Sequence, residues 1–128
     1  MARKRDGLRL PPQSLESEKA LLGALMIRSD GMIERVDLLS DDAFYSEKHR
    51  MIYRAMLQLY GKAEPIDVES VRARLSDLGQ LEQVGGVAYL AELAAEVPAA
   101  SNARHYASAV QKKFMLRSLI DAGEYVAE

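Results

Sequence analysis

The chain has 128 residues and a mass of 14.2 kDa, which suits one domain with one hydrophobic core. Its 48% hydrophobic and 28% charged residues are typical of a soluble globular domain and exclude general disorder. The net charge of -2 argues against a domain that works mainly by neutralising phosphates, and the lack of cysteine excludes disulfides and thiolate chemistry. Because the sequence shows neither a signal peptide nor a membrane span, it fits a cytoplasmic location.

The N-terminal leader, residues 1–12, is basic, and we expect it to be a flexible, solvated terminus that ends at a Pro-Pro pair. Ser14 is predicted to N-cap a first helix over about residues 14–28. Glu16 and Glu18 fall in its first turns, where the positive end of the helix dipole favours a carboxylate. Capping and the dipole therefore account for both acids without a catalytic role.

A short helix is predicted over residues 32–39, followed by an irregular link in which Phe44 and Tyr45 are expected to anchor the core. Ser46 is predicted to cap a second strong helix that Gly61 ends. Apolar residues at helical spacing predict a core-facing stripe on this helix: Ile52, Ala55, Met56, Leu59 and Tyr60.

Asp67 is predicted to cap a helix over residues 68–78 that Gly79 ends. A glycine pair at 85–86 then opens a short helix that Pro98 terminates. Backbone amides at the pair could hold an anion, but positive φ angles and close packing of helices explain it more simply.

The last predicted helix is capped by Ser101 or Asn102 and runs nearly to the C-terminus, a length of about 35 to 40 Å. So small a core cannot cover it, and its C-terminal apolar residues are expected to project as an interaction surface: Phe114, Leu119, Ile120 and Val126. The chain ends without a helix stop signal, so we expect it to be part of a longer protein whose next segment covers some of that surface.

These elements predict an all-α protein, a small multi-helix bundle over residues 13–98 with a long helix over residues 99–128. No catalytic, cofactor-binding or metal-binding residue is expected. The sequence lacks a Walker-type loop, and its serines lie at helix caps or within helices. His49 and His105 lack metal-ligand spacing, and His49 is predicted to be a packing or hydrogen-bonding residue.

Six short patterns, read in order, resemble one family. They are Pro11-Pro12-Gln13-Ser14-Leu15-Glu16-x-Glu18 with Leu22-Gly23, Phe44-Tyr45-x-x-x-His49, Pro65-Ile66-Asp67, Leu81-Glu82-x-x-Gly85-Gly86-x-x-Tyr89-Leu90, Pro98-x-x-x-Asn102 and Tyr106-Ala107-x-x-Val110. Each alone is weak, but their order and spacing together resemble the N-terminal domain of the DnaB-type bacterial replicative DNA helicases over about residues 10–128.

This resemblance implies a helical bundle that ends in the first helix of a helical hairpin. In the family such domains pair through their hairpins and form the collar of a hexamer. A separate C-terminal motor domain, with ATP and Mg, unwinds DNA at the replication fork. The implied partners are further copies of the chain, a DnaG-type primase and a helicase loader; DNA is contacted mainly through the motor, and no membrane is involved. The implied location is the cytoplasm, at forks in the nucleoid.

For primase binding or self-association we expect contributions from five residues on or near the last helix: Glu16, Tyr89, Arg117, Ile120 and Val126. Tyrosine and arginine are enriched at interface hot spots, although Tyr89 is as readily explained as a packed core residue. Two alternatives stay open. Single-stranded DNA binding is disfavoured by the acidic charge balance and the scarcity of phenylalanine. A helix-turn-helix regulator would place Arg72 and Arg74 beside three acids on one short helix, which would repel phosphates.

Overall fold

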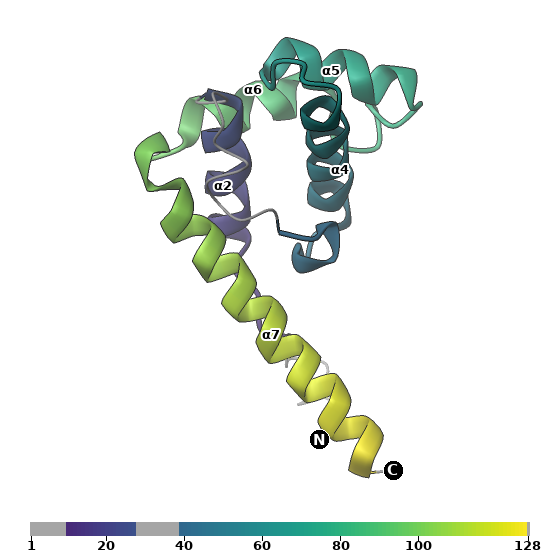
Figure 1. Cartoon of the computed structure of the whole chain (residues 1–128), viewed down its shortest axis with the longest axis vertical. Coiled ribbons are helices and arrows are strands. Elements are labelled where there is room, and N and C mark those ends of the chain that lie inside the picture. Colours follow the sequence, from purple (N-terminus) through teal and green to yellow (C-terminus); the bar gives the residue numbers. More distant parts are fainter. Residues whose placement is uncertain (1–9, 28–38, 128) are drawn as a thin grey trace.

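The computed structural model describes residues 10–27 and 39–127. These residues form five α-helices and two short 3-10 turns without a strand, so the all-α prediction is confirmed (Figure 1). The elements in chain order are α2 (Leu15–Ile27), η1 (Asp41–Ala43), α4 (Glu47–Gly61), α5 (Val68–Asp77), α6 (Gly86–Glu96), η2 (Ala100–Asn102) and α7 (Ala103–Ala127).

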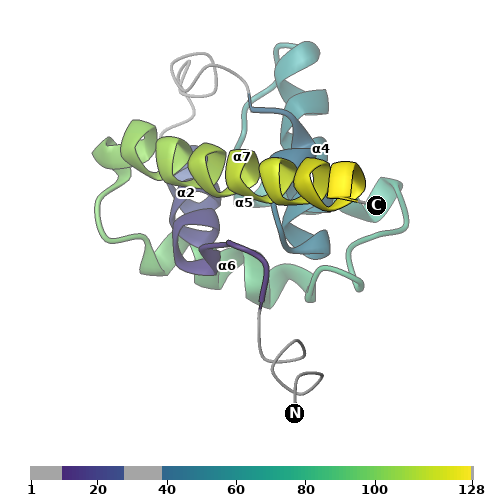
Figure 2. The same ribbon diagram turned by 90° about the horizontal axis from the view of Figure 1, so that it is seen from below.

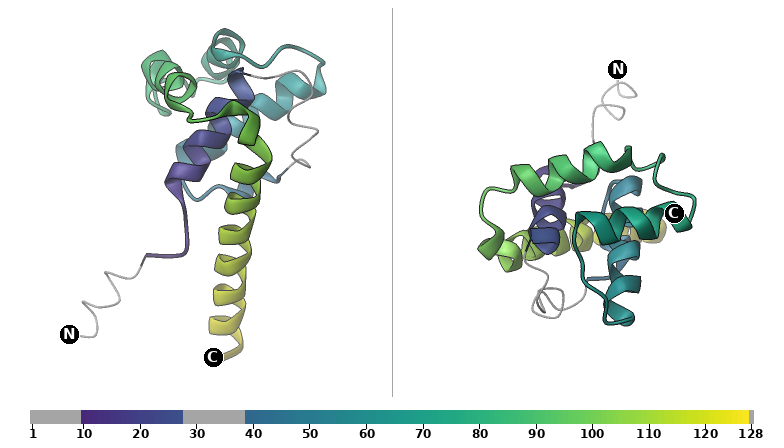
Figure 3. Two further views of the ribbon diagram at one scale, coloured as in Figure 1. Left: turned by 90° about the vertical axis from the view of Figure 1, so that its left-hand side faces the viewer. Right: turned by 90° about the horizontal axis from the view of Figure 1, so that it is seen from above.

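Helices α2, α4, α5 and α6 form the bundle, and α7 leaves it as a long projecting helix (Figure 1, and Figure 3, left). The first half of α7 packs against α2 and η1, and in Figure 2, which is seen from below, α7 crosses in front of the bundle. With 25 residues, α7 is about 38 Å long at 1.5 Å per residue. The bundle covers only its first half, as the length predicted.

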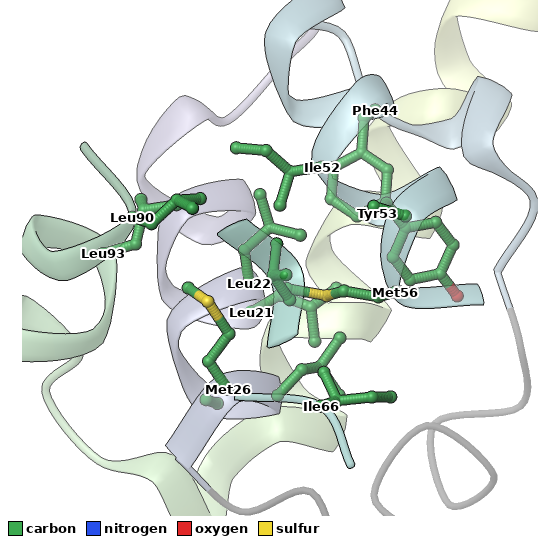
Figure 4. Close-up of a cluster of buried hydrophobic side chains, with 14 of the residues drawn as sticks. Leu21, Leu22, Met26, Phe44, Ile52, Tyr53, Met56, Ile66, Leu90 and Leu93 are labelled. Carbon is green, nitrogen blue, oxygen red and sulfur yellow. The ribbon is translucent and has the colours of Figure 1, made fainter. Parts of the chain in front are cut away.

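The core lies between α2, α4, α5, α6 and the first half of α7, and Figure 4 shows part of it. Helix α2 contributes Leu21, Leu22 and Leu25, all fully buried. Phe44 enters from the segment before α4, and its ring lies 4.8 Å from that of Tyr53. Burial of each such side chain contributes roughly 1.5 to 3 kcal/mol, which makes this cluster the main source of stability.

Most predicted helix ends are confirmed. The Ser14 hydroxyl accepts a 3.3 Å hydrogen bond from the Ser17 amide, and the Asp67 carboxylate accepts one of 2.8 Å from the Ser70 amide. Gly79 follows α5 with a φ of 72°, the left-handed conformation that suits glycine at a helix end. Helix α6 ends two residues before Pro98.

Several details differ from the sequence prediction. Ser46 precedes α4, but its hydroxyl makes no capping hydrogen bond. Tyr45 is half-buried beside the core instead of within it, and Tyr60 is 36% exposed at the end of α4. The link expected to be irregular begins with the 3-10 turn η1, and the left-handed residue after α4 is Ala63, with a φ of 57°, instead of Gly61. The helix predicted over 32–39 falls almost wholly outside the described residues.

Glycines shape the backbone at two places. Gly85 and Gly86 have φ angles of 105° and 74°, so the predicted positive φ angles are confirmed. The tightest helix contact lies elsewhere, at Gly23 in α2. A Cβ atom there would lie 2.1 Å from the backbone oxygen of Leu93 in α6. The absence of a side chain at Gly23 therefore allows α2 and α6 to pack with their backbones nearly in contact.

Candidate interaction surfaces

A buried polar chain links three helices of the bundle. His49 in α4 is 2% exposed, and its Nδ1 lies 2.8 Å from a carboxylate oxygen of Glu18 in α2. On the other side of the ring, Nε2 lies 2.7 Å from the hydroxyl of Tyr89 in α6. His49 is therefore a buried hydrogen-bonding residue, as predicted.

Glu18 has a different role from the one its sequence position suggested. It is 1% exposed, and its carboxylate accepts hydrogen bonds from the backbone amides of Tyr45 at 2.6 Å and Ser46 at 3.3 Å. Tyr45 and Ser46 immediately precede α4, so Glu18 fixes to α2 the segment that leads into α4. The sequence does signal the burial of Glu18, because Glu18 falls on the apolar stripe that Leu21, Leu22 and Leu25 continue.

Tyr89 is half-buried at the outer end of this chain. The Lys48 ammonium lies 3.8 Å from the centre of its ring, a cation–π contact. Burial, helped by the negative charges of Glu92 and Glu18, raises the pKa of Tyr89 to about 12. The phenol therefore stays protonated at physiological pH and retains its hydrogen for His49.

Arg117 ties the projecting helix to the bundle. Its guanidinium donates 2.8 Å hydrogen bonds to the backbone oxygens of Pro12 and Ala43. It also lies 5.5 Å from the ring of Tyr45 and 5.8 Å from that of Phe114. Phe114 is packed against the core, so the expectation that it projects from α7 is wrong. These contacts of Arg117 fix the orientation of α7 relative to the bundle.

Beyond the bundle, α7 carries a continuous apolar strip. We call it the α7 strip. It consists of Met115 (55% exposed), Leu116 (40%), Leu119 (67%) and Ile120 (46%). Their spacing places them on one side of the helix, while its packed side is formed by residues 103, 107, 110 and 114. Large apolar side chains gathered on one exposed helix face indicate an interaction surface. The exposure predicted for Leu119 and Ile120 is confirmed, and the side chain of Val126 lies outside the described residues.

The fifth predicted residue, Glu16, is exposed in the first turn of α2. It lines a groove of about 480 Å³ together with the end of α6 and the start of α7, where His105 and Tyr106 lie. The five predicted residues thus fall on three helices, with Glu16 on α2, Tyr89 on α6 and the other three on α7.

Within residues 10–27 and 39–127, no group of three or more His, Cys, Asp or Glu side chains is arranged to hold a metal ion. No helix in the same ranges is long and apolar enough to cross a membrane. The polar chain of Glu18, His49 and Tyr89 has structural partners at both ends, so its geometry is accounted for by linking helices.

The fold and surfaces define a class of protein: an all-helical domain with a packed apolar core and a long helix that presents an apolar face. Comparison with known proteins supplies the family. The sequence model described as the DnaB-like helicase N terminal domain matches residues 10–112. The chain belongs to this family, and the resemblance seen in the sequence patterns is confirmed.

Similar proteins agree with this assignment. The chain is 41% identical to the replicative DNA helicase DnaB of Geobacillus stearothermophilus and 40% identical to the replicative DNA helicase DnaC of Bacillus subtilis, each over 120 residues. These matches cover 94% of the chain but only 26% of each relative, so the chain spans about a quarter of their length.

Solved structures show the same fold. The N-terminal domain of DnaB helicase from Mycobacterium tuberculosis is 40% identical with a TM-score of 0.87, covering 92% of this chain and 84% of that one. A DnaB-like replicative helicase, determined together with its interactions with primase, is 29% identical with a TM-score of 0.79, covering 89% of this chain and 27% of that one.

Proposed function

We propose that the chain is the N-terminal collar domain of a replicative DNA helicase, which supports hexamer assembly and docks the primase. In the whole protein, unwinding of duplex DNA would be driven by ATP and Mg in a separate C-terminal motor domain, and DNA would be contacted mainly there. A helicase loader is a further expected partner, and the place of action would be the replication fork in the bacterial cytoplasm.

The observation that carries the proposal is the α7 strip. Four large apolar side chains on one helix face are exposed to water at a cost of roughly 25 cal/mol per Å² of apolar surface. A second copy of the chain offers a strip of the same composition, and a two-fold contact buries both at once. The exposed α7 strip therefore supports an assembly role in which two copies of the chain pair through α7.

Self-association measured by sedimentation tests this role. Leu119→Lys puts a charge into the most exposed residue of the α7 strip, so we expect dimers to weaken while the free energy of unfolding stays nearly the same. Leu78→Lys is the matched control, because Leu78 is 37% exposed at the end of α5, away from α7. Equal self-association of the two variants would refute pairing through this strip.

The primase role is supported by the similar solved structure of a DnaB-like replicative helicase and its interactions with primase. We assign the contact to the five residues predicted from the sequence: Glu16, Tyr89, Arg117, Ile120 and Val126. Calorimetric titration with the C-terminal domain of the primase from the same organism tests it. Alanine at Ile120, which is 46% exposed, should weaken binding, whereas alanine at exposed Val87 should not. Equal affinity of both variants would remove Ile120 from the contact.

No observation favours the two alternatives. Arg72 pairs with Glu69, and Arg74 donates a hydrogen bond to Gln58, so both arginines of the suggested recognition helix have partners within the chain. A gel shift with single-stranded and duplex DNA at low salt would detect direct binding, and we expect none from this domain.

A further inference from the structure

The hydroxyl of Tyr89 is bonded to His49, and His49 is bonded to Glu18; both residues are buried, so a partner cannot reach them. We propose that His49 and Glu18 are positioning residues that hold Tyr89 in one orientation for the docking of the primase. This inference rests on the proposed function, because it concerns the same surface. It adds two buried residues that determine how that surface is presented.

The polarity of the hydrogen bonds gives the chain a direction. Glu18 already accepts from two backbone amides, and as a carboxylate it can bond to His49 only through a donor. In a neutral ring, Nδ1 therefore carries the hydrogen and Nε2 is left with a lone pair. The Tyr89 hydroxyl, 2.7 Å from Nε2, is then the donor to that lone pair. The acceptor role of Glu18 thus determines which nitrogen of His49 carries the hydrogen, and this in turn makes the Tyr89 hydroxyl the donor.

The anchor is rigid because it also builds the bundle. Glu18 holds the backbone amides of Tyr45 and Ser46, just before α4, and His49 lies in the first turn of that helix. Lys48, next to His49, covers the Tyr89 ring with its ammonium group. On its own helix, Tyr89 packs against the backbone of Gly85, where a Cβ atom would lie 2.8 Å from the Tyr89 Cβ. The side chain is therefore held at both its tip and its base.

A residue held in this way loses little conformational entropy when a partner covers it. Immobilising a tyrosine that is free to rotate would weaken binding by roughly two- to tenfold, whereas the Tyr89 side chain is already immobilised in the folded chain. The effect concerns only the half-exposed ring, so it acts on docking and not on the self-association of α7.

His49→Asn separates positioning from folding. The asparagine amide nitrogen lies as many bonds from the backbone as Nδ1, so it can still donate to Glu18, but it cannot reach the Tyr89 hydroxyl. Tyr89→Phe removes the same bond from the other side while keeping the ring. Tyr60→Phe is the control, because Tyr60 is exposed at the far end of α4. Thermal unfolding of each variant verifies that it is folded.

Two readouts test the proposal. By NMR three-bond couplings, the Tyr89 side chain should occupy one χ1 rotamer in the natural chain and average between rotamers in His49→Asn; a single rotamer in both would overturn positioning. By calorimetry with the primase C-terminal domain, each variant should bind about fivefold more weakly, because the Tyr89 side chain must then be immobilised on binding, and the double variant should bind no more weakly than either.

The two failures are distinguishable. If the natural chain does not bind the primase domain, the proposed docking function fails, and so does the docking part of this inference, while the NMR couplings still decide whether His49 orients Tyr89. If the natural chain binds and His49→Asn binds equally well, the positioning role is wrong and the docking function stands. Additive losses in the double variant would also overturn it, because they would mean that His49 acts independently of Tyr89.

Discussion

Replacement of Gly23 by alanine should destabilise the domain, although alanine is the better helix former. In an open helix the change is favourable by about 1 kcal/mol. Here the new Cβ would lie 2.1 Å from the backbone oxygen of Leu93 and 3.3 Å from the Cβ of Val97, whereas ordinary contacts begin at 3.4 Å. The oxygen belongs to the backbone of α6, so no side chain can rotate away, and the two helices must separate.

Overpacking of this kind typically costs about 1 to 3 kcal/mol, and the rigid backbone neighbour favours the upper end. After the gain in helix propensity, we expect a net loss of about 2 kcal/mol in the free energy of unfolding. For a domain of this size that lowers Tm by about 8 °C, at about 4 °C per kcal/mol.

Urea unfolding followed by far-UV circular dichroism measures this difference directly. Gly123→Ala is the matched control, since Gly123 also lies inside a helix, α7, and a Cβ there meets nothing within 4 Å. The control should be stabilised by up to about 1 kcal/mol. If Gly23→Ala is as stable as the natural chain or more stable, with an unchanged m-value, the close approach of α2 and α6 is refuted.

Three further predictions concern single interactions. Asp67→Ala should cost about 1 kcal/mol in urea unfolding, because it removes the cap that accepts from the Ser70 amide. The Arg54 hydrogen bond lowers the pKa of Asp41 below its ordinary value of 3.8, so this pair stabilises the fold above that pH and the benefit is lost as the pH falls through the lowered pKa. The stability gap between the natural chain and Arg54→Gln should therefore close in acid, and a gap that persists there would contradict this assignment. Arg117→Lys should lower stability by about 1 to 2 kcal/mol in thermal unfolding, because an ammonium cannot reproduce the forked donation to two backbone oxygens.

The local elements were predictable because their signals are local. Caps such as Ser14 and Asp67, the glycine after α5 and the proline after α6 act within a few residues, and the structure places these helix ends within one or two residues of the prediction. The exposure of Leu119 and Ile120 was also predictable, since a helix of this length must extend beyond a core built from so few residues. The order and spacing of short patterns identified the family, which the comparisons confirm.

The interior polar chain was not predictable in this way. Glu18 is 27 and 28 positions from the backbone amides that it bonds, and His49 is 40 positions from Tyr89. In the sequence, each of these residues had a sufficient local explanation: the helix dipole for Glu18, and packing for His49 and Tyr89. Their shared role depends on how α2, α4 and α6 are placed, which no sequence spacing specifies.

The sequence by itself determined which segments are helical, where most of them start and stop, and which family the chain belongs to, because propensity, capping and apolar spacing are properties of neighbouring residues. The tertiary structure alone decided that Gly23 brings two backbones together and that Glu18 holds the segment before α4. It also decided that Arg117 orients α7 and that buried residues hold the Tyr89 hydroxyl. These depend on distances between helices, and such distances are set only when the whole core is packed.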